Sequence, residues 1–180
     1  MTNYICINGV IEEQDYEIYK YGFQTGLELL TCVITCLIAA VYLNSIKECI
    51  ILLGLFFLQR AYAGGIHLQS FLSCYLLSCS VIILGIKFSA VSVLEPFVVL
   101  ILITLMAVVI HRLAFFLTKK QCDLEETIYY RRQRRKMYVL IDILSVVFYI
   151  FGREQDMNLV FYAESVVLIA VALEICDKSK

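Results

Sequence analysis

The sequence contains no tryptophan, a single proline and only two histidines among its 180 residues, and charged residues make up just 17% of it. Alongside so little charge, 61% of the residues are hydrophobic and the mean hydropathy is +0.83. The apolar stretches are too long for the core of a soluble domain. These features exclude an ordinary soluble protein and predict an all-α polytopic membrane protein.

The N-terminal segment lacks the pattern of a cleavable signal peptide. Acidic side chains stand where a signal would have its apolar centre: Glu12, Glu13, Asp15 and Glu17. The same segment has one apolar stripe at helical spacing, formed by Ile11, Ile18, Tyr19 and Gly22. We therefore expect an amphipathic helix over residues 1–22 that lies in the membrane interface.

The apolar runs predict about six membrane-spanning helices. They cover residues 24–43, 49–63, 71–87, 89–110, 137–152 and 157–176. The second and fifth fall short of the ~20 residues that a span needs, so they must include flanking polar residues or cross a thinned bilayer. We expect one integral membrane domain over 1–180, made of a four-span part (24–110), a basic loop (111–136) and a two-span part (137–180).

Basic residues are distributed unevenly over the predicted loops. If the N-terminus is cytoplasmic, twelve of the 15 Lys and Arg residues fall inside, and only Lys47, Lys87 and Arg153 fall outside. This positive-inside bias sets the predicted orientation in the membrane, and the net charge of −1 therefore says nothing about partners. The basic run 131–136 is interpreted as an anchor on anionic lipid, and no nucleic acid partner is expected.

His67 and Cys74 stand in a break between two apolar runs, where Gly64 and Gly65 interrupt the pattern. A thiolate is a strong nucleophile, and a nearby imidazole can take its proton. On one straight helix the two residues would be about 10.5 Å apart along the axis, too far for proton transfer. If they act together, the segment must be a broken helix or re-entrant turn that faces the cytoplasm.

Several polar residues are candidates for supporting roles around this pair. Arg60 is suited to binding a carboxylate of a substrate or of the protein itself, although it also fits a positive-inside anchor. Glu28 and Asp142 lie at a comparable predicted depth and are candidate partners of Arg60 or His67, or bundle contacts. Gln59, Gln69 or a backbone carbonyl are candidates to orient His67. No role is predicted for Glu164.

The eight cysteines are not spaced like ligands of zinc or like a disulfide framework. Cys32 and Cys36 are four residues apart, and Cys74 and Cys79 are five apart. Apart from Cys74 we expect reduced thiols that pack in helices, with no metal site and no cofactor.

The residues from Arg60 through Gly65, with His67 and Cys74, resemble the motif of the accessory gene regulator B (AgrB) family of membrane cysteine endopeptidases in bacterial quorum sensing. The likeness extends to the acidic N-terminal helix, the segment Tyr21-Gly22-Phe23-Gln24 and the basic loop. The chain departs from the family where it lacks proline between His111 and Gln121. The resemblance implies that Cys74 is the nucleophile and His67 its base, with Arg60, Gly64, Gly65 and Gln24 as further motif residues.

The resemblance also implies the reaction and the partners. The expected substrate is a short amphipathic pro-peptide, similar to AgrD, that is cut near its C-terminal tail. A thioester on Cys74 would then pass to a thiol or hydroxyl of the peptide and close a thiolactone or lactone ring. A homodimer is expected. Two other classes stay open, a non-catalytic transporter or export factor and a scaffold acting through residues 119–136, although inverted repeats typical of many transporters are not evident.

Overall fold

The computed structural model describes residues 16–63, 71–91, 94–121 and 124–177. These residues form six α-helices and no strand: α2 (Tyr16–Tyr42), α3 (Ile46–Ala63), α4 (Phe71–Ser89), α5 (Pro96–Gln121), α6 (Leu124–Ile150) and α7 (Glu154–Asp177). The all-α fold is confirmed. Three helices contain stretches that are long and apolar enough to cross a membrane by themselves, Leu72–Ser89, Pro96–Phe116 and Glu154–Cys176, and a shorter apolar stretch covers Gly26–Tyr42.

The helix ends follow local backbone chemistry. Asn44 after α2 and Gly152 after α6 have positive φ angles of 52° and 64°, which end a right-handed helix. In both turns the next residue donates its N–H to a carbonyl five residues back, Ser45 to Ala40 and Arg153 to Phe148. At the start of α5, the Glu95 carbonyl accepts the first helical hydrogen bond and Pro96 occupies the first helical position.

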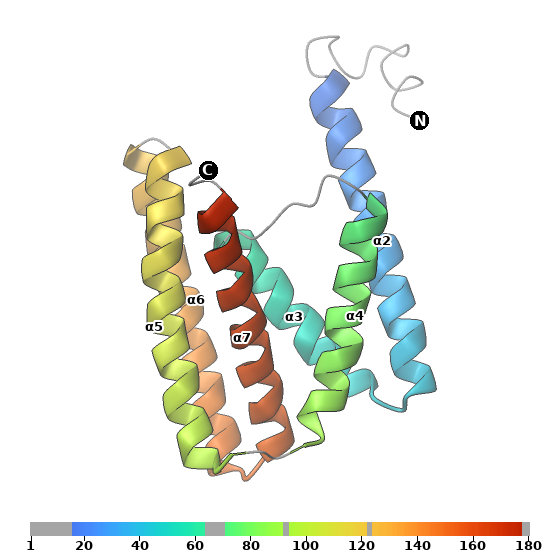
Figure 1. The fold of residues 1–180 in the computed structure, drawn as a ribbon, viewed down its shortest axis with the longest axis vertical. Coiled ribbons are helices and arrows are strands. Elements are labelled where there is room, and N and C mark those ends of the chain that lie inside the picture. Colours follow the sequence, from blue (N-terminus) through green and yellow to red (C-terminus); the bar gives the residue numbers. More distant parts are fainter. Residues whose placement is uncertain (1–15, 64–70, 92–93, 122–123, 178–180) are drawn as a thin grey trace.

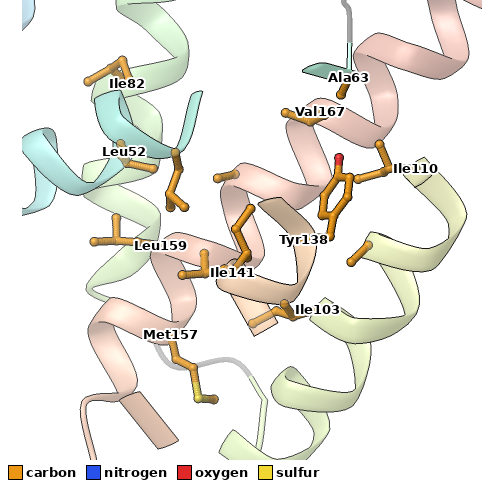
Figure 2. Packing of buried hydrophobic residues seen from close by; sticks show 14 of the residues in the cluster. Leu52, Ala63, Ile82, Ile103, Ile110, Tyr138, Ile141, Met157, Leu159 and Val167 are labelled. Carbon is orange, nitrogen blue, oxygen red and sulfur yellow. The ribbon is translucent and has the colours of Figure 1, made fainter. Parts of the chain in front are cut away.

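Helix α7 is the centre of the bundle. It packs against α3, α4, α5 and α6, while α2 packs mainly against α4. In Figure 1, α5 and α6 run side by side at one edge, and α2 and α4 form the other. The core between them is aliphatic, with Leu52, Ile103 and Leu159 fully buried among its side chains (Figure 2).

The helices alternate in direction, so six helix termini gather at one end of the bundle, the upper end in Figure 1. These are the first turns of α2, α4 and α6 and the last turns of α3, α5 and α7. The upper end therefore carries Arg60 and Cys74, and the basic run 131–136 begins about two turns into α6 from that end. The lower end carries Lys47 and Arg153, whose side chains both pair with the buried carboxylate of Asp156, at 2.7 and 2.5 Å.

Three sequence predictions require correction. Most of the predicted basic loop 111–136 is helical, since α5 continues to Gln121 and α6 begins at Leu124. The physical reason is that this stretch has no proline or glycine and is rich in good helix formers, and a helix can continue beyond the apolar part of its span. The fourth span begins at Pro96 and not at residue 89. Residues 16–22 are continuous with the first span in α2, while the rest of the predicted interfacial helix lies outside the described residues.

Candidate functional site

Cys74 lies in the first turn of α4, because the helix begins only three residues earlier, at Phe71. Its side chain is half-buried, and it forms no disulfide. The predicted place of Cys74, one turn into the third span, is confirmed.

Helix α3 ends at Ala63 and α4 begins at Phe71, and the two run in opposite directions in Figure 1. They are therefore not one straight helix, which would have kept the imidazole of His67 and the thiol of Cys74 about two turns apart. The predicted break at Gly64 and Gly65 and the residue His67 lie outside the described residues. The pairing of His67 with Cys74 stays a prediction.

Arg60 and Gln59, neighbours at the end of α3, differ in burial. Arg60 is exposed, in the last turn of the helix, whereas the Gln59 side chain is completely buried. The Gln59 amide nitrogen donates a short hydrogen bond to the Glu164 carboxylate of α7, which is also completely buried. This bond fixes the last turn of α3 to the centre of the bundle, and it leaves Arg60 free to face outward.

A polar layer surrounds Glu164 inside the core. Tyr138 of α6 lies close enough to Glu164 and Arg134 for an electrostatic interaction with each. Asp142 of α6 interacts electrostatically with Glu164. Arg134 is fully buried, although the neighbouring Arg135 is exposed. Figure 2 shows Tyr138 between Ile110 of α5 and Val167 of α7. Polar and ionisable side chains from α3, α6 and α7 thus gather in the interior, where burying a polar group without a hydrogen bond is costly.

The other candidate residues fall in different places. Asp142 belongs to this polar layer, and α6 packs on α3, α5 and α7. Glu28 is half-buried on α2. Gln24 is also on α2, but its side chain lies outside what the structure describes.

Sequence reasoning missed the roles of Glu164 and Arg134. The sequence predicts no role for Glu164 and places Arg134 in a basic run on the membrane surface, whereas both residues are completely buried. One signal was available for Arg134: it heads an apolar face of α6 at helical spacing that continues through Tyr138, Ile141 and Ser145, all of them buried. An ionisable residue in mid-span, such as Glu164, also tends to face the bundle interior.

Comparison with protein families gives a match to the family described as accessory gene regulator B (AgrB) over residues 1–175. Comparisons with curated proteins and with solved structures give no match. The matched region includes every candidate site residue from Gln24 to Asp142. It also covers all six described helices except the last residues of α7.

Proposed function

The chain belongs to the accessory gene regulator B family, and we propose that it is the membrane cysteine endopeptidase that cleaves the pro-peptide of this system. Membership of the family gives the chain a role in agr quorum sensing and implies an AgrD-like pro-peptide as its partner. The observation that carries the proposal is the position of Cys74, the only half-buried thiol in the first turn of a described helix, seven residues after His67 in the sequence. The active site faces the cytoplasm, on the side favoured by the basic residues.

The reaction needs one nucleophile and one base. His67 takes the proton from the Cys74 thiol, and the thiolate attacks the scissile carbonyl near the C-terminal tail of the peptide. The tetrahedral intermediate collapses as the C–N bond breaks, and the departing amine receives the proton from His67. The N-terminal part of the peptide is then held on Cys74 as a thioester, while the C-terminal fragment leaves.

Ring closure follows by acyl transfer. A thiol or hydroxyl inside the peptide attacks the thioester carbonyl, the bond to the Cys74 sulfur breaks, and the proton of the attacking group returns to the enzyme thiol. The product is a thiolactone or lactone. Hydrolysis of the thioester would be downhill whereas thiol exchange is nearly balanced, so the site must keep water away from the thioester. A half-buried sulfur at membrane level supports that requirement.

Arg60 is assigned to substrate positioning. It is exposed in the last turn of α3, and a guanidinium can bind a carboxylate of the acidic peptide tail through two parallel hydrogen bonds. The Gln59–Glu164 hydrogen bond, one residue away, holds the turn from which Arg60 projects. The exposed members of the basic run, Arg131, Arg132, Arg135 and Lys136, are assigned to anionic lipid at the same membrane surface. The active form is expected to be a homodimer.

The test is co-expression with the pro-peptide and measurement of the released C-terminal fragment. Cys74→Ala and His67→Ala should each lower cleavage by more than about 100-fold while membrane insertion is retained, because nucleophile and base act as a unit. Cys49→Ala, which removes a buried thiol elsewhere, is the matched control and should cleave normally. Near-normal cleavage by Cys74→Ala would overturn the endopeptidase and favour an export factor.

A further inference from the structure

Three cysteine side chains converge where α2 meets α4, with Cys79 five residues beyond Cys74 on α4. Cys32 and Cys36 project from one face of α2, since they are four residues apart, and Cys79 faces them from α4. The Cys79 sulfur lies 3.9 Å from that of Cys32 and 4.0 Å from that of Cys36. All three sulfur atoms lie within 4.8 Å of one another. We call these residues the thiol triad.

The spacing of the triad matches a metal ion at its centre. Metal–thiolate bonds of about 2.3 Å, arranged as a planar triangle, place the sulfurs about 4.0 Å apart. Two of the three pairs already have this separation, and the third requires only a small side-chain rotation. Binding of a metal ion would therefore require little movement of α2 and α4.

The donor set selects the class of ion. Three sulfur ligands favour a soft cation, and oxygen-seeking ions such as Mg²⁺ and Ca²⁺ are excluded. Structural Zn²⁺ almost always takes four ligands, whereas the group found among the described residues has three, all thiols, with no histidine or carboxylate. Cu(I) is a soft ion that thiolates select, and it accepts three sulfur ligands.

Neighbouring contacts hold the triad in place before any ion binds. The Tyr75 hydroxyl of α4 donates a 2.9 Å hydrogen bond to the Thr35 hydroxyl of α2, beside Cys36. Polar bonds of this kind fix helix pairs inside membranes. Cys36 itself is buried, and the thiol of Cys49 in α3 donates to its backbone carbonyl at 3.6 Å. The triad is thus attached to three helices, and no element needs to fold around the metal.

We propose that Cys32, Cys36 and Cys79 form a three-sulfur binding site for Cu(I), which bridges α2 to α4. Each sulfur that binds as a thiolate releases its proton to solvent. The copper enters and remains as Cu(I), so the binding step requires no oxidant or reductant. Because the ion binds only the folded bundle, it should stabilise the protein and tie α2 to the helix that carries Cys74. The site does not depend on the proposed peptidase activity.

The experiment uses the full chain in detergent micelles, reduced and without oxygen, titrated with Cu(I) against a colorimetric Cu(I) chelator. The wild-type protein should retain one Cu(I) per chain. Cys32→Ser, Cys36→Ser and Cys79→Ser should each weaken binding by more than about 100-fold, more than the loss of an outer-shell contact. Cys49→Ser is the matched control, because that thiol is buried beside the triad but outside the group of three. It should bind as the wild type does.

A second measurement needs no variant. X-ray absorption at the copper edge of the wild-type complex should show sulfur neighbours only, three per ion. Nitrogen or oxygen neighbours would overturn the proposal, and so would copper retention by the triple serine variant equal to that of the wild type. Formation of a disulfide on adding copper, detected as a loss of two hydrogens in the intact mass, would likewise overturn it.

Discussion

Gly85 packs tightly against side chains of α7 and α3, and a single added methyl group tests that packing. A Cβ at this position would lie 2.7 and 2.9 Å from two ring carbons of Tyr162 and 2.8 Å from a terminal methyl of Leu52. The Leu52 methyl can rotate away. The Tyr162 ring cannot do so easily, because its hydroxyl donates a 2.9 Å hydrogen bond to the Val81 carbonyl of α4.

Gly85→Ala should therefore lower the free energy of unfolding by about 1–3 kcal/mol, the usual cost of overpacking a tight core. The measurement is reversible unfolding in detergent micelles, followed by circular dichroism. Gly54→Ala is the matched control, because Gly54 is also helical and a Cβ there would meet no atom within 4 Å. It should leave stability unchanged or raise it by about 0.5–1 kcal/mol, since alanine is the better helix former.

A double-mutant cycle identifies the cause. With Tyr162→Ala, the ring is gone, so adding Gly85→Ala should cost much less than it does in the wild type. An equal cost in both backgrounds would refute the steric explanation, and so would a Gly85→Ala protein as stable as Gly54→Ala. Any shift of α4 would also move Cys74, so cleavage of the pro-peptide should fall in step with the loss of stability.

Two further predictions concern the polar layer and the orientation. Glu164→Leu should lower the free energy of unfolding by about 1–3 kcal/mol, because it leaves the buried Gln59 amide without its acceptor. Glu164→Gln keeps an acceptor and should lose less stability. Equal losses in the two variants, measured in the same unfolding assay, would contradict this account. Compartment-specific reporters fused after Lys136 and near Lys87 should report opposite sides of the membrane, with Lys136 on the cytoplasmic side. If both reporters are on the same side, the proposed arrangement of helices across the bilayer is wrong.

The helix ends show how far local sequence predicts this fold. The Glu95-Pro96 pair marks the start of α5, and Asn44 and Gly152 supply the positive φ that ends α2 and α6. These positions depend on a few neighbouring residues, so sequence can indicate them. The prediction of a loop over 111–136 is wrong, because a charged segment is not for that reason irregular in structure. Lys, Arg, Glu and Gln are good helix formers, and only a breaker such as proline or glycine would have required a loop there.

The candidate site depends on contacts that no local pattern contains. Cys74 was placed correctly because its position one turn into a helix follows from a nearby helix start. The Gln59–Glu164 bond joins residues 105 positions apart, and it exists only because α3 crosses α7 at that height. The thiol triad likewise needs α2 and α4 to meet in one register, since a quarter-turn rotation of either helix would point the sulfurs apart. Spacing within one helix could show that Cys32 and Cys36 share a face, but only the packing shows that Cys79 completes it.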